Sequence, residues 1–275
     1  MFTLNCKGRL LVVDKPIVMG IINSTPDSFY AGSRFTEKDT VLRAAEKMLK
    51  EGAVLLDIGG QSTRPGSTRV SVEEEKKRVV PKIELLARNF PEAFISIDSY
   101  SSEVASEAVD AGAVMVNDIS AGSFDKNMIS YAASAKTPYI VMHMQGEPGT
   151  MQNNPHYENI GKEVLDFFIR KTEECRIAGI RDVIIDPGFG FGKTIAHNFR
   201  LLKELSVLQI LQKPILVALS RKSTVYKTLG ISPDEALNGT TVLNTLALQN
   251  GASILRVHDV KEAVEAIKLW EAYNE

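Results

Sequence analysis

Cysteine is scarce in this chain of 275 residues, which contains only Cys6 and Cys175. The two lie far apart and belong to no Cys-x-x-Cys or Cys/His spacing, so the sequence predicts neither a disulfide framework nor a zinc site. An excess of one charge is also missing, because the formal net charge is −2 and basic and acidic residues are interspersed. Without a basic patch, the chain lacks the usual signature of binding to nucleic acid or to an anionic membrane. A small-molecule partner is therefore favoured.

Long apolar runs are absent as well. Lys7 and Arg9 come soon after Leu4, which leaves no signal-peptide core, and no later run reaches the about 18 apolar residues of a membrane span. We therefore expect a cytoplasmic protein. What is present is an ordinary globular composition of 44% hydrophobic and 24% charged residues, in a chain long enough for one large core. We expect a single domain that covers residues 1–275.

Short apolar or β-branched runs recur along the chain and predict eight buried strands. They lie at residues 17–23, 54–60, 94–99, 114–120, 139–144, 182–188, 215–220 and 253–259. Segments with a helical period alternate with these runs, and glycines such as Gly52 and Gly112 follow two of them where a helix C-cap is favoured. This alternation allows a closed barrel or an open doubly wound sheet, and strand count and length favour a (β/α)8 TIM barrel. Residues 2–13, with Gly8 between two apolar runs, are expected to form an N-terminal β-hairpin on the barrel floor.

Polar residues stand at the carboxyl end of nearly every predicted strand. In chain order they include Asn23, Gln61, Arg64, Asp98, Asn117, His143, Asp186, Lys222, Arg256 and His258. In a barrel these ends meet on one face, where each unpaired buried polar group would cost about 1–3 kcal/mol. One such residue alone is more often a turn or cap; Asp98, for example, is well placed to cap a helix that begins near Ser101. The whole set instead predicts a ligand site at the barrel mouth.

Three longer motifs extend this pattern of polar strand ends. They are MGIINSTPDSF at residues 19–29, DIGGQSTRPG at 57–66 and DPGFGFGK at 186–193, joined by IDS at 97–99, VNDI at 116–119, MH at 142–143, SRK at 220–222 and RVHD at 256–259. As an ordered set, they closely resemble the dihydropteroate synthases. The resemblance implies condensation of 6-hydroxymethyl-7,8-dihydropterin diphosphate with p-aminobenzoate, giving 7,8-dihydropteroate and diphosphate in folate biosynthesis. It also implies a homodimer and competition between sulfonamides and p-aminobenzoate.

The polar strand ends suit the pterin. A carboxylate can accept from the adjacent amino group and ring N–H of a pterin, and by resemblance Asp186 has this role. The other edge of the ring suits Asp98, Asn117 and Lys222, although Lys222 alone could equally lie in a solvated loop. Apolar walls are expected from Ile119, Met142 and Phe191, although each of them could equally belong to the core.

The diphosphate and the second substrate need further groups. A leaving diphosphate requires positive charge, which Arg64, Arg256 and His258 supply from strands that neighbour the first strand in a closed barrel. Asn23 is expected to contact a diphosphate-bound Mg²⁺ through its side-chain oxygen, with an Asx-turn as the alternative. The p-aminobenzoate is expected between the first two strand-end loops and Lys222. Its contacts would come from Phe29, Thr63, Arg64, Pro65 and Ser223.

The expected catalytic set is Asp98, Lys222, Arg256 and His258. An arylamine is unprotonated near neutral pH, so the reaction needs no strongly activated base, which agrees with the lack of a Ser-His-Asp or Cys-His signature. The electron-rich dihydropterin can stabilise a cation at its methylene, and Asp98 would favour that cation electrostatically. The glycine-rich run at 186–193 lacks P-loop spacing and is interpreted as a tight loop over the pterin. His143 is interpreted as structural or solvent-facing rather than catalytic.

Three positions depart from the family pattern: Ala31 replaces a second acidic residue, Gln61 a glutamate and Ser99 a threonine. Ala31 leaves open a non-catalytic paralogue that only binds pterin. A pterin- or folate-dependent methyltransferase domain is a second alternative, but it would not be expected to carry Arg64 and Lys222. A sugar-phosphate enzyme is a third, and it would leave the pterin-like strand ends unexplained.

Overall fold

The computed structural model describes residues 1–23, 37–61 and 69–275. Eight parallel strands form its centre: β3 (Ile17–Asn23), β4 (Leu55–Gly59), β5 (Phe94–Asp98), β6 (Met115–Asp118), β7 (Tyr139–Met142), β8 (Val183–Asp186), β9 (Leu216–Val217) and β10 (Ile254–Val257). Their order is β8-β7-β6-β5-β4-β3-β10-β9, and a parallel bridge between Ile185 and Ile215 joins the two ends of the sheet. The eight strands and the (β/α)8 barrel are confirmed, and the open sheet is excluded.

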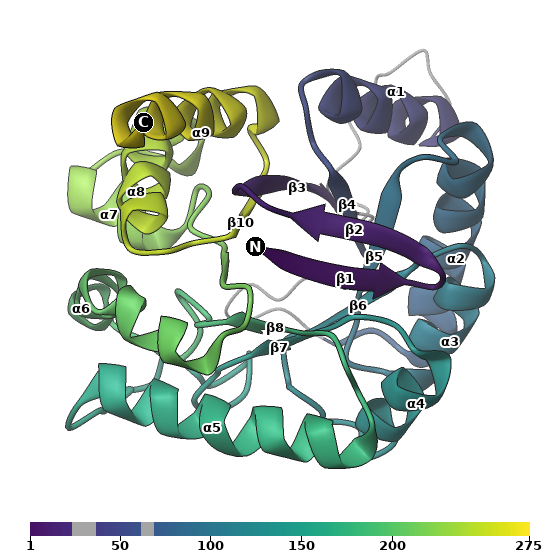
Figure 1. Cartoon of the computed structure of the whole chain (residues 1–275), viewed down its shortest axis with the longest axis horizontal. Helices are drawn as coiled ribbons and strands as arrows, with labels where there is room; N and C mark the ends of the chain where they lie inside the picture. The colour runs from purple at the N-terminus through teal and green to yellow at the C-terminus, as the bar shows by residue number, and fades with distance from the viewer. Residues whose placement is uncertain (24–36, 62–68) are drawn as a thin grey trace.

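Helices surround the barrel as an outer ring (Figure 1). They are α1 (Glu37–Lys50), α2 (Val72–Asn89), α3 (Ser102–Asp110), α4 (Met128–Ala135), α5 (Ile160–Ala178), α6 (Ile195–Lys203), α7 (Ser223–Leu229), α8 (Leu237–Gln249) and α9 (Val260–Asn274), with 3₁₀ helices η2 (Leu205–Leu211) and η3 (Pro233–Glu235). Gly52 and Gly112 follow α1 and α3 with φ of 104° and 121°. That left-handed region favours glycine, which explains why both helices end there. Among the described residues, no helix has the length and apolarity to cross a membrane.

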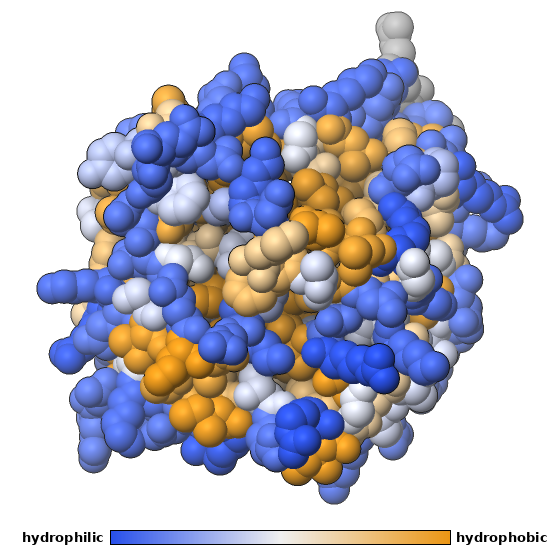
Figure 2. All heavy atoms as spheres, viewed as in Figure 1, coloured by the Kyte–Doolittle hydropathy of each residue, from blue (hydrophilic) through white to orange (hydrophobic). Residues whose placement is uncertain are grey.

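An antiparallel hairpin of β1 (Phe2–Cys6) and β2 (Arg9–Val13) lies across the barrel in Figure 1. Its inward side chains Leu4, Cys6, Leu11 and Val13 are buried against the first residues of the parallel strands, such as Ile17 and Leu55. The hairpin therefore closes the amino end of the barrel. Figure 2 shows this same face, with apolar residues gathered near its centre. The carboxyl ends of the strands open on the opposite face.

A second apolar cluster lies between the sheet and the helices. It includes the fully buried Tyr139, Phe168 and Phe189. Ile169, which follows Phe168 in α5, is 49% exposed and does not join this cluster. The helices thus bury one face each, as the packing of helices on a barrel requires.

Candidate active site

The sheet register aligns the polar strand ends at the barrel mouth. Asn23 of β3 pairs with Gly59 of β4, Gly59 pairs with Asp98 of β5, and Asp98 pairs with Asn117 of β6. A Cβ atom on Gly59 would lie 3.5 Å from Oδ2 of Asp98, so the glycine leaves space beside this carboxylate. One layer of the barrel mouth therefore carries an amide, a gap, a carboxylate and a second amide.

Arg256 of β10 joins two carboxylates within this mouth. Its Nε donates to Oδ2 of Asp57 and its Nη2 donates to Oδ2 of Asp98, both over 2.6 Å. Nδ2 of Asn117 donates to the same Asp57 oxygen over 2.9 Å. The other oxygen of Asp57, Oδ1, is buried and has no hydrogen-bond partner among the described residues. The four side chains form one polar cluster, which fixes Asp98 and Asn117 before any ligand binds.

The electrostatics of this cluster depend on burial and on Arg256. Burial raises the pKa of Asp98 to about 7, Arg256 opposes this rise, and Asp57 and Glu75 add to it. Burial lowers the pKa of Arg256, but Asp57 and Asp98 outweigh it, so the net pKa is raised. Arg256 is therefore always charged, while Asp98 titrates near neutral pH.

A second group of site residues lies around the turn after β8. Gly188 N donates to Oδ1 of Asp186 over 2.8 Å, and Nζ of Lys222 donates to the carbonyl oxygen of Phe189 over 2.5 Å. The same Nζ lies 4.7 Å from the centre of the Phe191 ring, which is cation–π distance. Asp186, Lys222 and Phe191 are thus held together by one loop, residues 188–192.

The charges of Asp186 and Lys222 shift each other's pKa, and the charges of Arg256 and Asp98 also contribute. Burial raises the pKa of Asp186, opposed first by Lys222 and then by the Gly188 N–H. Burial lowers the pKa of Lys222 to about 8, opposed by Asp186. Because Arg256 and Asp98 also contribute to the pKa of Lys222, the two groups share one electrostatic environment. The mouth combines carboxylates with cations, as recognition of a polar heterocycle that bears a diphosphate requires.

Several predicted residues sit at the rim of the same mouth. His258 is exposed at the end of β10, with Nδ1 3.0 Å from Oγ of Ser220. Ser223 is partly buried as the first residue of α7, and Asn23 is exposed. Ile119 and Met142, by contrast, are buried, with 5% and 2% of their surface exposed. Phe29, Thr63, Arg64, Pro65 and Ala31 lie outside the described residues.

The structure decides two of the alternatives left open by the sequence. Ser101 itself caps α3 by accepting from Val104 N, while Asp98 is bound to Arg256. Asp98 is therefore not a helix cap. Lys222 does not lie in a solvated loop either, because it contacts Phe189 and Phe191.

Sequence reasoning gave no role to Asp57, Glu75 or Lys193. Asp57 is fully buried, and a charged residue in the middle of the apolar run Leu55–Gly59 was the signal that could have found it. Glu75 is 2% exposed in the first turn of α2, where burial raises its pKa and a hydrogen bond with Ser99 opposes that rise. Serine at position 99, where the family commonly has threonine, therefore still provides a hydroxyl group for the Glu75 carboxyl group. Gln61 likewise donates to the Tyr100 hydroxyl.

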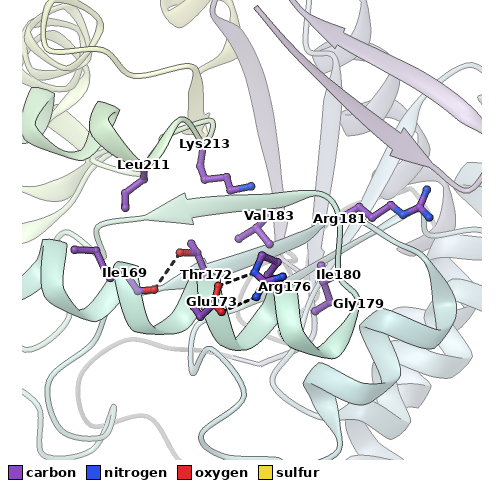
Figure 3. Close-up of a pocket in the computed structure, with 10 residues that line it drawn as sticks. All are labelled: Ile169, Thr172, Glu173, Arg176, Gly179, Ile180, Arg181, Val183, Leu211 and Lys213. Carbon is purple, nitrogen blue, oxygen red and sulfur yellow. Dashed lines mark hydrogen bonds and ion pairs between the residues drawn. The ribbon is translucent and has the colours of Figure 1, made fainter.

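A groove on the described part of the chain lies away from this mouth. It has a volume of about 860 Å³ and lies between α5 and the segments that lead into β8 and β9. Figure 3 shows Ile169 and Thr172 of α5 on one side and Leu211 and Lys213 on the other. Its lining residues precede or begin their strands, so the groove lies at the amino ends, where barrel enzymes do not carry out their chemistry.

The donor set at the mouth suits a weakly held Mg²⁺. Asn23 is exposed at the end of β3 and has a side-chain oxygen, a ligand type that Mg²⁺ accepts. Among the residues that the structure describes, no three His, Cys, Asp or Glu side chains form a metal-binding group. A single amide oxygen such as that of Asn23 is compatible with a Mg²⁺ ion that takes most of its ligands from water and phosphates.

Known proteins are similar to this chain in sequence and in fold. Residues 19–258 match the family model described as pterin binding enzyme. The dihydropteroate synthase of Escherichia coli (strain K12) is 42% identical over 268 residues, which cover 97% of this chain and 94% of that protein. The Yersinia pestis dihydropteroate synthase, solved with a sulfonamide drug complex, has a TM-score of 0.93 at 42% identity over 99% of both chains. The Xanthomonas albilineans enzyme, solved with 7,8-dihydropteroate, has a TM-score of 0.90 at 38% identity over 99% of both chains.

Proposed function

This chain belongs to the dihydropteroate synthases of the pterin binding enzyme family, and we propose that its barrel mouth joins p-aminobenzoate to 6-hydroxymethyl-7,8-dihydropterin diphosphate. The products are 7,8-dihydropteroate and diphosphate, so the enzyme is a transferase of folate synthesis. The observation that carries the proposal is the cluster of Asp98, Asn117 and Arg256 in one mouth with Asp186 and Lys222. A pterin-binding methyltransferase domain does not account for the partly buried cation Lys222.

The pterin is proposed to lie between the two groups of the mouth. The Asp186 carboxylate would accept from the amino group and ring N–H of the pterin, since two adjacent donors match one carboxylate. Asp98, Asn117 and Lys222 would bind the opposite edge. Their hydrogen bonds to Arg256, Asp57 and Phe189 hold them in place beforehand, which limits the entropy lost on binding.

Departure of the diphosphate is the step that needs positive charge. Arg64, Arg256 and His258 would stabilise the negative charge as it develops, and Asn23 would hold Mg²⁺. When bound, Mg²⁺ neutralises charge on the diphosphate oxygens. Asp98, buried beside the reacting methylene in this pose, would favour the cation left behind on the pterin.

The arylamine then attacks the methylene carbon with its lone pair. The C–O bond to diphosphate has already broken, so the new C–N bond forms at the cationic methylene carbon, and the amine nitrogen then loses a proton. In the proposed pose, p-aminobenzoate contacts Ser223 together with Phe29, Thr63, Arg64 and Pro65. A sulfonamide has a similar aniline ring and should compete for the same place.

Product analysis tests the proposed function. Purified protein is incubated with the dihydropterin diphosphate and Mg²⁺, with and without p-aminobenzoate, and the products are identified by mass. Dihydropteroate formed only when p-aminobenzoate is present supports the proposal. Pterin binding without diphosphate release would instead indicate a non-catalytic pterin-binding protein, the alternative that Ala31 leaves open.

Two further parts of the proposal need separate tests. Activity should fall on chelation of Mg²⁺ and in Asn23→Ala. We also propose a homodimer through the outer helices, because Val242 and Leu246 of α8 are 53% and 46% exposed. Light scattering should give twice the chain mass for the wild type and a smaller mass for Leu246→Glu. A monomeric wild type would contradict the dimer.

A further inference from the structure

Lys193 is a buried lysine that the proposed reaction does not use. Its side chain is 2% exposed, and its Nζ lies 2.9 Å from Nδ1 of His143. The same Nζ donates to the carbonyl oxygens of His143, Gly188 and Phe191 over 3.2, 2.9 and 3.1 Å. Burial lowers the pKa of Lys193 to about 7, and Asp186 opposes this change. In its charged form the Lys193 amine has three N–H donors and no acceptor, so these oxygens and the ring nitrogen can satisfy it completely.

His143 is held as a neutral partner in this arrangement. Burial and the nearby Lys193 charge lower the pKa of His143 well below its usual value. Nδ1 of a neutral imidazole can accept from the Lys193 ammonium. The ring packs edge-on against Phe167 at 5.0 Å between centres. His143 therefore faces α5, which supports its interpretation as structural.

Loop 188–192 packs directly on the chain that follows β7. A Cβ atom on Gly188 would collide with the carbonyl oxygen of His143, and one on Gly192 would collide with that of Gln145. Both glycines also have positive φ, at 68° and 61°. Gly188 and Gly192 have no side chain that could bond to the segment after β7. Lys193, which follows Gly192, forms such a bond with the carbonyl oxygen of His143.

The same loop carries the pterin groups. Gly188 N bonds Asp186, the carbonyl of Phe189 accepts from Lys222, and the Phe191 ring lies beneath the Lys222 ammonium. Two of the three carbonyls bound by Lys193, those of Gly188 and Phe191, flank this Phe189 carbonyl. A displaced loop would therefore move both Asp186 and Lys222 relative to the pterin.

We propose that Lys193 is a positioning residue of the pterin site, whose ammonium group ties loop 188–192 to the end of β7 and so sets the geometry of Asp186 and Lys222. This inference rests on the proposed function, because it takes the pterin as the ligand. Lys193 acts through the loop and does not touch the substrate. It should therefore affect pterin binding more than the chemical step.

The test compares Lys193→Met with Lys82→Met, which removes another buried lysine, on α2. Calorimetry with 6-hydroxymethylpterin gives the pterin Kd, and steady-state kinetics give kcat and the KM of each substrate. For Lys193→Met we expect Kd and the pterin KM to rise about tenfold, as for loss of one charge-assisted hydrogen bond. We expect kcat and the p-aminobenzoate KM, measured at saturating pterin, to stay within about threefold of wild type. Lys82→Met should leave all four values near wild type.

Other outcomes separate the competing explanations. An unchanged pterin Kd in folded Lys193→Met would overturn the inference, and so would a loss of kcat at unchanged Kd. If Lys193→Met does not fold, Lys193→Ala is assayed with n-propylammonium, which replaces the missing atoms, and with n-propanol as control. Recovery of pterin binding with the amine alone supports the positioning role, whereas no recovery or equal recovery contradicts it. A wild type that binds no pterin would refute the proposed function instead.

Discussion

Arg256 on β10 donates from Nε to Oδ2 of Asp57 on β4 over 2.6 Å, across the intervening strand β3. Its Nη2 holds Asp98 at the same distance. One cation thus neutralises two carboxylates that would otherwise repel each other in a buried space. Arg256 links strands that are distant in the chain, and it fixes the orientation of the Asp98 carboxylate at the barrel mouth.

Arg256→Met should destabilise the fold as well as the reaction. The substitution leaves Asp57 and Asp98 buried without their cation, which costs about 3–5 kcal/mol when one partner of a buried pair is removed. Urea unfolding measures the change in the free energy of unfolding. Arg200→Met is the control, because its ion pair with Glu204 is largely exposed and should contribute less than about 1 kcal/mol. Equal small losses in both variants would show that the buried cluster is not stabilised as described.

Pterin affinity should be highest between about pH 7 and pH 8. Asp98, with its pKa raised to about 7, loses its negative charge as pH falls below that value. Lys222, with its pKa lowered to about 8, loses its proton as pH rises above that value. Both changes remove a charged hydrogen-bonding group, so affinity for 6-hydroxymethylpterin should fall on either side. Calorimetry across this range measures it.

The alkaline side of that profile has its own control. Lys222→Arg keeps its charge at every pH studied, because arginine does not deprotonate in this range. The absolute pterin affinity of Lys222→Arg can differ from that of the wild type, but it should not fall as the pH rises above about 8. A flat wild-type profile, or an alkaline loss centred near pH 8 that persists in Lys222→Arg, would contradict the assigned charges. A loss centred near pH 7 would instead report Lys193, whose pKa burial lowers to about 7.

Gly188→Ala should damage the pterin site through the backbone. A Cβ atom at this position would collide with the carbonyl oxygen of His143, and φ is 68°. Strain of this kind costs about 1–3 kcal/mol and would displace the loop that carries the Asp186 and Lys222 contacts. Pterin Kd, measured by calorimetry, should rise about tenfold or more, with a lower thermal midpoint. Gly149→Ala is the matched control, since nothing lies within 4 Å of its added Cβ; an equal effect there would refute the reason given.

Much of the fold was predictable because strand and helix alternate with local signals. The eight runs and glycines such as Gly52 and Gly112 identify the elements, and the hairpin follows from two short apolar runs around Gly8. Closure was not decided by periodicity, because buried parallel strands have the same pattern in a barrel and in an open sheet. The pairing near Ile185 and Ile215 that closes the ring depends on tertiary structure.

The sequence predicted which strand-end residues lie at the barrel mouth. It did not predict a role for residues inside strands or loops, such as Asp57 and Lys193. Asp98, Asn117, Asp186, Lys222 and Arg256 were recognised by position and motif, but their partners were not. Asp57 lies within a strand and becomes meaningful only when β10 brings Arg256 to it. In the sequence, Lys193 is only the last residue of a glycine-rich motif. Its role depends on its contact with the carbonyl oxygen of His143 after β7, which only the structure shows.

The proposed pose of the pterin depends above all on the assignment of Asp186 as its carboxylate acceptor. Calorimetry with 6-hydroxymethylpterin on wild type and Asp186→Asn tests it most directly, with Asp166→Asn, an exposed aspartate paired with Lys162 on α5, as control. The substitution preserves shape but removes the charge that accepts two N–H donors, so Kd should rise at least about tenfold in Asp186→Asn and stay unchanged in the control. Equal pterin affinity in wild type and Asp186→Asn would contradict the assignment.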